Sequence, residues 1–351
     1  MLSKGEMMEL TVMVPARNEE ACLEACLHSL TTQSEPGFEL GRHWELIVID
    51  DGSTDATHRI AESVAGVTVM NAPPLEAKPG RKGMTGKNNA LWAAAQQAKG
   101  KWLLFTDADT RHASGSLGRA MREAEKYEAA LLSYSPKQIV TGFWQRALMP
   151  LIFSELAIAY PPKKVSDPAS RIAAANGQFL LIDRESYFAV GGHQAVGDKV
   201  LEDVELAWKV KASRRRLRFR YGGDALETQM YRTLPAMIEG WTKNLAILFL
   251  QPLALAGFRL IDFGLLISLP ILMVVLPQHL LLLWWQWAAL GLLWIRVLWR
   301  YLARVRKSEF PWIDCVLSIA ALPMFAWLLW RSWMQVKLKH EVVWKGRVYK
   351  A

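Results

Sequence analysis

Residues 45–55 read ELIVIDDGSTD, and this stretch decides the fold. Glu45–Ile49 is mostly apolar and is typical of a buried strand, which the polar turn Asp50-Asp51-Gly52-Ser53 then closes. We expect a helix to follow over about 54–64 and to end at Gly66. A strand that ends in acids and passes directly into a helix is the unit from which parallel sheets are built.

The same alternation of strand and helix continues on both sides of this stretch. Strands are predicted over 10–14, 67–70 and 101–106, and helices over 19–32, with Asn18 as the N-cap, and over 87–98. This order predicts an α/β fold with a mainly parallel sheet. In such sheets ligands bind beyond the carboxyl ends of the strands, where three polar groups should therefore meet: Pro15-Ala16-Arg17-Asn18, Asp50-Asp51 and Asp107-Ala108-Asp109.

Two common nucleotide-binding motifs do not fit the sequence. A dinucleotide site would need G-x-G-x-x-G after the first strand, where the chain has VPARNEE. A P-loop is excluded because Gly80 and Gly86-Lys87 are too far apart and Asn88 follows the lysine. What remains is a group of carboxylates with Lys87. Carboxylates at strand ends repel one another unless a cation offsets them, and oxygen donors favour Mg²⁺ or Mn²⁺, which commonly binds a substrate diphosphate.

The chain of 351 residues changes character along its length. With 52% hydrophobic residues and 42 Lys and Arg against 33 Asp and Glu, it is not a disordered chain. Its three Cys do not form a disulfide framework, and Cys22 and Cys26 are predicted to be small core residues. From Phe263 to Ile295 there is no charged residue in 33 positions, and 11 of the 16 Trp lie beyond residue 240.

This uncharged stretch is too long for a buried core helix and predicts membrane helices. We expect spans over about 261–276 and 280–299, separated at Pro277-Gln278-His279, and a third apolar segment over 315–330. The N-terminal sequence MLSKGEMMEL lacks the apolar segment of a secretory signal.

The positive charges constrain the topology. The basic segment 300–307 and the basic tail should both face the cytoplasm, which three full spans cannot satisfy. Either 315–330 is a re-entrant hairpin bent at Pro323, or Leu245–Phe258, which otherwise resembles an interfacial helix, supplies a fourth crossing. The expected number of crossings is therefore two to four.

Five motifs occur in a characteristic order: VPARNEE at 14–20, VIDDGSTD at 48–55, TGKNNAL at 85–91, TDAD at 106–109 and LEDVELAWK at 201–209. In this order they resemble the family 2 glycosyltransferases. With its apolar C-terminal part, the chain is similar to membrane-bound members, the hopanoid-associated, carotenoid and ceramide glycosyltransferases. The resemblance covers about residues 9–245.

The resemblance implies a nucleotide-diphospho-sugar domain of the GT-A type and an inverting transfer of a hexose, with a UDP-sugar as the expected donor, to a lipid acceptor. The expected organisation is a catalytic domain over 1–240 on the cytoplasmic side of the cell membrane. An interfacial helix region over 241–260, transmembrane helices over 261–335 and a basic cytoplasmic tail over 336–351 follow it.

The resemblance also implies roles for particular residues. Asp203 would be the general base, and Asp109 with Asp107 would bind Mg²⁺ or Mn²⁺. Gln229 and Arg232 resemble the first part of a Q-x-x-R-W motif that would contact the diphosphate or the acceptor. Thr233 stands where the Trp would be, which argues against a processive polysaccharide synthase. The residues expected to bind the nucleotide-sugar are Pro15, Arg17, Glu19, Asp50, Asp51, Lys87, Asp107, Asn176 and Glu202.

Each of these assignments has a structural alternative. Asp50 and Asp51 could cap the helix that follows them, and Asp107 and Asp109 could lie in a solvated turn. Glu202-Asp203 opens a predicted helix, where acids are favoured by the helix dipole. Arg232 could be a cation at the membrane surface. The basic run 209–220 is either a solvated face or a contact with anionic lipid, and no nucleic-acid-binding module accompanies it.

Alternatives at the level of function also remain. One base without a second carboxylate nucleophile is the inverting arrangement. Transfer to polyprenyl phosphate would need that base less, because the acceptor is already anionic. A non-catalytic membrane scaffold with the same fold is the rival of another class. Leu245–Phe258 and Phe143–Tyr160 could form an access groove for the lipid, or could simply be core helices.

Overall fold

The computed structural model describes residues 8–33, 35–75, 83–275, 283–339, 341–344 and 347–350. The expected break at Pro277-Gln278-His279 lies outside these residues. The chain divides into two compact units, the first made of 1–139 and 162–230 and the second of 140–161 and 231–351. This division differs from the expected single boundary at residue 240, because the segment 140–161 packs with the C-terminal helices.

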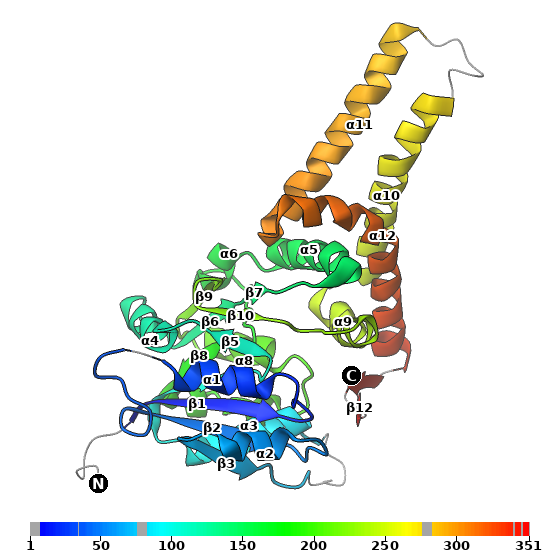
Figure 1. Cartoon of the computed structure of the whole chain (residues 1–351). Helices are drawn as coiled ribbons and strands as arrows, with labels where there is room; N and C mark the ends of the chain where they lie inside the picture. Colours follow the sequence, from blue (N-terminus) through cyan, green and yellow to red (C-terminus); the bar gives the residue numbers. More distant parts are fainter. Residues whose placement is uncertain are drawn as a thin grey trace. The chain divides into compact units, whose positions relative to one another are not determined.

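The first unit is built on a seven-stranded sheet with the order β3-β2-β1-β4-β8-β6-β9 (Figure 1). Strands β3, β2, β1 and β4 are parallel, β8 is antiparallel to both of its neighbours, and β9 is parallel to β6. The prediction of an α/β fold with a mostly parallel sheet is confirmed. The strands are β1 (Met8–Ala16), β2 (Trp44–Asp50), β3 (Val67–Asn71), β4 (Gly100–Phe105), β6 (Leu131–Ser135), β8 (Leu180–Asp183) and β9 (Leu217–Tyr221).

Alternate residues of each strand point to opposite faces of the sheet, and helices pack against each face. Leu10 and Val12 belong to a buried cluster with Leu27 and Leu117, whereas Phe105 contacts the ring of Tyr187. The helices of the unit are α1 (Leu23–Thr31), α2 (Thr57–Ser63), α3 (Gly86–Gln97), α4 (Ser116–Lys126), α6 (Pro162–Ser166), α7 (Arg184–Ala189), the 3₁₀ helix η1 (Gly192–Val196) and α8 (Glu202–Ala212).

Asn18 does not cap the first helix, which begins only at Leu23. The φ angle of Asn18 is 52°, a left-handed conformation that cannot continue into a right-handed helix but that Asn tolerates. Its side-chain Oδ1 instead accepts a hydrogen bond from the backbone N–H of Thr54 at 2.9 Å. Asn18 therefore ties together the loops that follow β1 and β2, and the predicted N-cap is wrong.

A small second sheet lies next to the acidic turn after β4. It has the order β5-β10-β7 and consists of β5 (Thr110–His112), β10 (Leu226–Thr228) and β7 (Lys137–Gln138). Beneath it the buried hydroxyl of Thr106 lies 3.0 Å from both Thr110 Oγ1 and His112 Nε2. Burial lowers the pKa of His112 to about 3, so this ring remains neutral and the network is uncharged at neutral pH.

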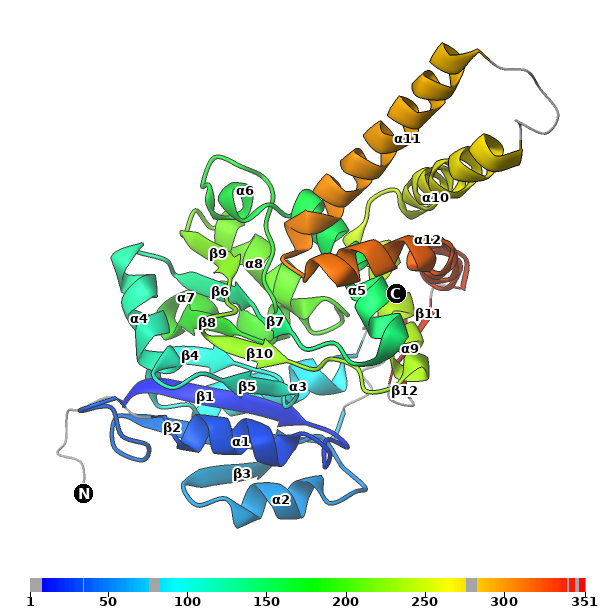
Figure 2. The ribbon, with the colours of Figure 1, turned by 45° about the horizontal axis from the view of Figure 1, so that its top comes forward.

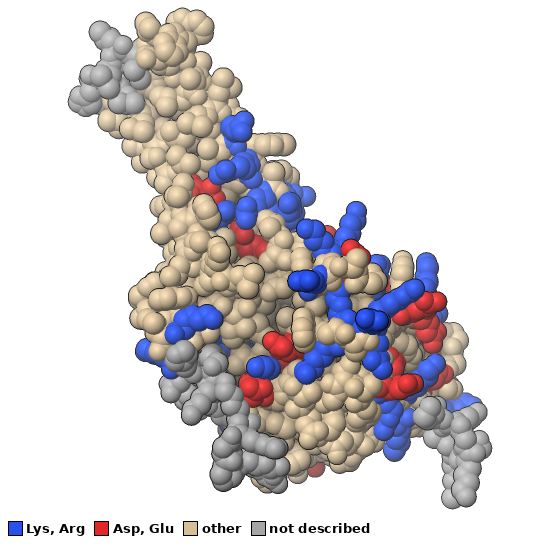
Figure 3. Space-filling model, turned by 180° about the vertical axis from the view of Figure 1, so that it is seen from behind, with Lys and Arg blue, Asp and Glu red and all other residues tan. Residues whose placement is uncertain are grey.

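The second unit is mainly helical (Figure 2). In the view of Figure 3, the outer parts of α10 and α11 show no acidic or basic side chain, as expected from the uncharged stretch 263–295. Its elements are α5 (Gly142–Ala159), α9 (Leu234–Leu248), α10 (Pro252–Val275), α11 (Trp284–Val305), η3 (Arg306–Ser308), α12 (Trp312–Trp333), the π-helical turn η4 (Met334–Lys339), and the paired strands β11 (Glu341–Trp344) and β12 (Arg347–Lys350).

Two helical segments among the described residues are long and apolar enough to cross a membrane, Pro252–Val275 and Trp312–Lys339. The first begins nine residues before the expected span at 261, because Pro252 starts the helix after a break at Phe249. The expected interfacial helix over 241–260 is thus divided between α9 and α10. The expected span over 280–299 is not supported, since α11 carries three arginines and is less apolar.

Pro323 does not bend a re-entrant hairpin. It lies inside the continuous helix α12, whose neighbouring residues Leu322 and Phe325 are fully buried. A proline removes one hydrogen bond from a helix, and here the packing of the flanking apolar side chains keeps the helix intact.

Three carboxylates of the second unit are buried and paired with arginines. Glu155 accepts two bonds from Arg304, each of 2.9 Å, and Asp262 lies 2.7 Å from Arg259 and 2.9 Å from Arg300. Asp314, in the first turn of α12, accepts from Arg146 Nε at 2.7 Å. Glu155, Asp262 and Asp314 are each 5% exposed or less, so these ion pairs connect helices α5, α10, α11 and α12 internally.

Candidate active site

The polar residues after β1, β2 and β4 do meet at one edge of the large sheet. The backbone N–H of Asp51 donates to Ala16 O at 2.9 Å, and that of Thr106 donates to Met13 O at 3.1 Å. The parallel register also pairs Pro15 with Ile49. The three loops expected to form a ligand site are thus adjacent through backbone hydrogen bonds.

Arg17 and Asp51 contact each other in this region. Arg17 Nη1 donates to the backbone carbonyl of Asp51 at 2.9 Å and lies 3.8 Å from its carboxylate. Asp50 is more buried, and its two oxygens contact Ser53 N at 2.9 Å and His58 Nδ1 at 3.1 Å. Asp50 therefore shapes the turn and holds the helix behind it, while the carboxylate of Asp51 faces Arg17.

Lys87 connects two of the acidic motifs. It lies in the first turn of α3, whose N-cap Thr85 accepts from Asn88 N, and its Nζ is 2.8 Å from Asp107 Oδ1 and 2.9 Å from Glu202 Oε1. Burial lowers the pKa of Lys87, but the attraction of Asp107 and Glu202 outweighs it, so the net pKa lies well above its usual range. Lys87 is a fixed positive charge.

Asp203 is the second residue of α8. Its Oδ2 accepts from the backbone N–H of Gly177 at 2.8 Å, and its Oδ1 accepts from that of Val204 at 2.8 Å. Burial and the negative charge of Glu202 raise the pKa of Asp203 to about 6, against the opposing effects of Lys87 and the two N–H groups. At neutral pH this carboxylate is ionised and close to its pKa, which suits proton acceptance.

Gly177 fits this position because it has no side chain. A Cβ there would lie 3.1 Å from Lys87 Nζ and 3.5 Å from Asp203 Oδ2. Asn176 forms the turn before it, since its Oδ1 accepts from Gln178 N at 2.9 Å and its own N–H donates to Ser133 Oγ at 2.8 Å. The Asn176 side chain is therefore engaged in the turn that presents Gly177.

Asp109 has neutral partners rather than a cation. Gln178 Nε2 lies 3.4 Å from each oxygen of the Asp109 carboxylate, and Thr228 Oγ1 donates to the Asp109 backbone carbonyl at 3.2 Å. Burial and the negative charges of Asp107 and Glu19 raise the pKa of Asp109 to about 7. Gln178 and Thr228 were not predicted from the sequence, where only the position of Gln178 directly after Asn176-Gly177 distinguishes it.

The donor set at Asp107 and Asp109 fits a hard divalent cation. Among the described residues, no group of three or more His, Cys, Asp or Glu side chains is arranged to hold a metal ion by itself. Mg²⁺ and Mn²⁺ sites of nucleotide enzymes commonly use one or two carboxylates and take further oxygens from the phosphates. Burial is the main cause of the raised pKa of Asp109, and the negative charges of Asp107 and Glu19, which a cation would offset, raise it further.

The remaining predicted residues, Glu19, Gln229 and Arg232, are divided between the two units. Glu19 is close enough to Asp109 to raise its pKa, and its backbone N–H donates to Thr57 Oγ1 at 2.8 Å. Gln229 follows β10 in the first unit, whereas Arg232 belongs to the second. The two residues of the expected Q-x-x-R motif thus lie in separate units.

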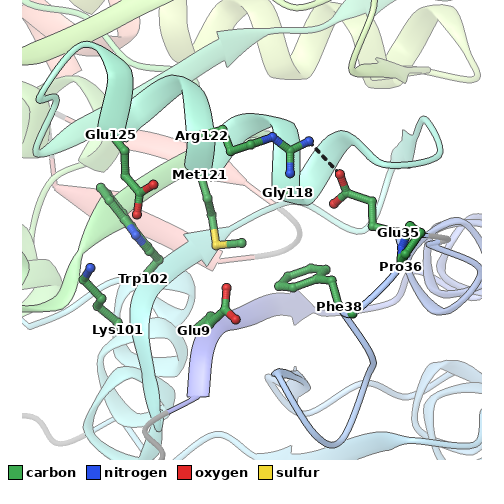
Figure 4. A pocket seen from close by; sticks show the side chains of 11 residues that line it. Glu9, Glu35, Pro36, Phe38, Lys101, Trp102, Gly118, Met121, Arg122 and Glu125 are labelled. Carbon is green, nitrogen blue, oxygen red and sulfur yellow. Dashed lines mark hydrogen bonds and ion pairs between the residues drawn. The ribbon is translucent and has the colours of Figure 1, made fainter.

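A hollow elsewhere in the first unit is lined by residues near the amino ends of β1 and β4 (Figure 4). It is lined by Glu9 near the start of β1, by Lys101 and Trp102 near the start of β4, and by Phe38 and Met121. Arg122 closes one side through an ion pair of 2.7 Å with Glu35. Because it opens at the amino ends of the strands, it is not the site built from the acidic motifs.

Comparison with known proteins shows that the chain is similar to glycosyltransferases. It is 27% identical over 241 residues to a 4,4'-diaponeurosporenoate glycosyltransferase of Staphylococcus aureus strain USA300, covering 68% of this chain and 60% of the relative. With the protein of that name from the bovine strain RF122, the identity is 27% over 350 residues, or 97% of this chain and 88% of the relative.

The fold also matches a solved structure. A mannosyltransferase from Pyrobaculum calidifontis, in complex with GDP-Man and Mn²⁺, superposes with a TM-score of 0.52 at 16% identity, over 94% of this chain and 87% of that one. The family model described as glycosyl transferase family 2 matches residues 11–187, just over half of the chain. The protein is therefore a member of glycosyl transferase family 2 with a GT-A-like fold.

Proposed function

We propose that the chain is an inverting glycosyltransferase that moves a hexose from a nucleotide-diphospho-sugar, with a UDP-sugar expected, to a lipid acceptor at the cytoplasmic face of the cell membrane. One observation carries the reaction. The consecutive residues Gly177 and Gln178 hold two carboxylates, Asp203 and Asp109, whose pKa values are both raised toward neutrality. A proton acceptor and a cation site are the two functions that this transfer needs.

Asp203 is the proposed base. Its carboxylate would accept the proton of an acceptor hydroxyl while the oxygen attacks the anomeric carbon and the diphosphate leaves from the opposite face. Lys87 is held between Asp107 and Glu202 and would add positive charge beside the diphosphate. Asp109 and Asp107 would hold Mg²⁺ or Mn²⁺, which would stabilise the charge on the departing diphosphate when bound.

The membrane association is also a proposal. Two long apolar helices and the uncharged stretch over 263–295 support it, and the Staphylococcus aureus relatives are named for transfer to a carotenoid acid. Hydrocarbon burial does not depend on salt, whereas attraction of basic patches to lipid weakens when ~1 M salt shortens the Debye length to ~3 Å. The protein should therefore stay in the membrane fraction after a high-salt wash, and release by salt would contradict membrane insertion.

The decisive experiment is product identification. The purified full-length protein would be incubated with Mn²⁺, a native lipid extract and a panel of labelled UDP- and GDP-sugars, and the lipid product would be analysed for its anomeric configuration. We expect label in one lipid class, with configuration opposite to that of the donor. Retention of configuration would contradict the single-base mechanism, and absence of any transfer would favour the scaffold.

The acceptor group can be distinguished by the need for Asp203. A hydroxyl acceptor must lose a proton, whereas a lipid carboxylate or a polyprenyl phosphate is already anionic. The raised pKa of Asp203 favours the hydroxyl, because a carboxylate with pKa about 6 is a better proton acceptor than an ordinary one. Full activity of Asp203→Asn on polyprenyl phosphate would favour the anionic acceptor instead.

A further inference from the structure

Residues from other segments contact both the side chain and the backbone of Asp109. The Nε2 atom of Gln178 lies 3.4 Å from both carboxylate oxygens of Asp109, and the same nitrogen donates to Thr228 Oγ1 at 2.9 Å. Thr228 in turn donates to the Asp109 backbone carbonyl at 3.2 Å. The three residues thus form a closed set of contacts.

This set of contacts is buried, and each of its donors has an acceptor, whereas the oxygen of the Gln178 amide has no hydrogen-bond partner among the described residues. Gln178 is 4% exposed and Thr228 is 1% exposed, and Thr106 Oγ1 donates to the Gln178 backbone carbonyl at 2.7 Å. If the Gln178 amide were reversed, its oxygen would face the Asp109 carboxylate, and two acceptors would repel each other. The Thr228 proton is already directed at the Asp109 carbonyl. The amide N–H groups therefore point to Asp109 and to Thr228.

The neutral charge of the amide matters for what Asp109 can bind. Asp107 has an ammonium group 2.8 Å away, which already compensates its charge. The Gln178 amide orients the Asp109 carboxylate without pairing it with a positive charge, so that the ionised carboxylate stays available for a cation. Partners of this kind fix metal-binding side chains in other proteins, and removing them typically weakens metal affinity about 10–100-fold.

We propose that Gln178, supported by Thr228, is a positioning residue that orients the Asp109 carboxylate toward a divalent metal ion. This inference rests on the proposed function, because it assumes that Asp109 binds the metal.

The test is Mn²⁺ binding to the full-length protein in the presence of UDP or GDP, followed by the EPR signal of free Mn²⁺. Gln178→Met keeps the length and burial of the side chain but removes the N–H donors. We expect its Mn²⁺ affinity to fall about 10–100-fold. Excess Mn²⁺ should restore turnover in Gln178→Met, because Asp109 is still present, but should not restore it in Asp109→Ala.

The matched control is Gln138→Met. Gln138 is also buried, lies on β7 of the small sheet opposite Thr228, and has an amide nitrogen that donates to the Pro136 carbonyl at 3.2 Å rather than to a carboxylate. It should lose comparable stability and keep its Mn²⁺ affinity. An equal loss of affinity in both variants would mean that general destabilisation is responsible and would overturn the inference.

Thr228→Val provides a second measurement that does not depend on whether Gln178→Met folds. It removes the hydroxyl that links Gln178 to the Asp109 backbone, so we expect weaker Mn²⁺ binding and a double variant whose loss is smaller than the sum of the single losses. Wild-type affinity in Thr228→Val, or in a folded Gln178→Met, would overturn the positioning role alone. Absence of Mn²⁺ binding by the wild-type protein would overturn the metal site as well.

Discussion

Two carboxylates of the first unit and two of the second are stabilised in opposite ways. In the second unit, Glu155 and Asp262 are buried and each contacts arginines at 2.7–2.9 Å. In the first unit, Asp203 and Asp109 contact backbone N–H groups and a neutral amide, and both have raised pKa values. A buried carboxylate that is paired with arginine holds helices together, whereas one held by neutral donors keeps its charge available for a proton or a cation.

The largest effect is expected from a change at Asp203, whose carboxylate is held by neutral donors. Asp203→Asn preserves the shape of the side chain and removes proton acceptance, so turnover should fall by about 10²–10⁴-fold while nucleotide-sugar binding is retained. The measurement is kcat with labelled donor, together with donor affinity by calorimetry.

Glu205→Gln is the matched control for Asp203→Asn, because both acids lie in the first turn of α8 and interact similarly with the helix dipole. It should retain turnover close to that of the wild type. A parallel loss of donor binding in Asp203→Asn would show that Asp203 belongs to the donor site and is not the base.

Asp109→Ala should have the next largest effect. Removing the proposed cation ligand should lower turnover by at least about 10²-fold and abolish Mn²⁺ binding in the presence of nucleotide. Asp224→Ala is the control, since that carboxylate is already paired with Arg220 at 2.6 Å. Full turnover of the wild type in excess chelator would exclude a metal requirement.

Breaking an arginine–carboxylate pair of the second unit should lower the free energy of unfolding rather than the turnover. Arg304→Ala leaves Glu155, which is 3% exposed, without its two-bond partner. Removing one partner of a buried pair costs about 3–5 kcal/mol, and we expect about 2–3 kcal/mol here because a third of the Arg304 side chain is exposed. The free energy of unfolding in detergent would measure this loss.

Arg296→Ala is the control for Arg304→Ala, because Arg296 is exposed on the same helix. Its effect on the free energy of unfolding should stay within about 0.5 kcal/mol. If both variants are equally stable, the arginine pairs do not hold the helices together and the contrast between the units is lost.

The smallest expected effect is on the pH dependence of kcat/KM. The pKa of Asp203 is raised to about 6, so the proposed base is ionised above pH 6 and protonated below it. With saturating Mn²⁺, kcat/KM should be constant above about pH 7 and fall about tenfold per unit well below pH 6. The Asp203→Asn variant should lack this acidic limb. An identical limb in the variant would assign the titration to another group.

Much of the first unit was predictable from local patterns. The strand over 45–49, the polar turn after it and the helices over 87–98 and after Asp203 follow from alternating apolar runs and turn residues, and the structure has them within a few residues. The start of the first helix was not predictable in this way. Asn18 resembles an N-cap in the sequence, but its partner is Thr54, 36 residues away.

The sequence by itself determined the order of strands and helices, the acids at the carboxyl ends of β2 and β4, and an uncharged stretch of 33 residues. These features depend on side chains that are near in the chain. Only the tertiary structure determined which acids are held by neutral donors, so that their charge is available for a proton or a cation, and which are paired with arginines. Gln178 meets Asp109 across 69 residues and Arg304 meets Glu155 across 149, and such contacts depend on the course of the loops and on burial, which no local pattern encodes.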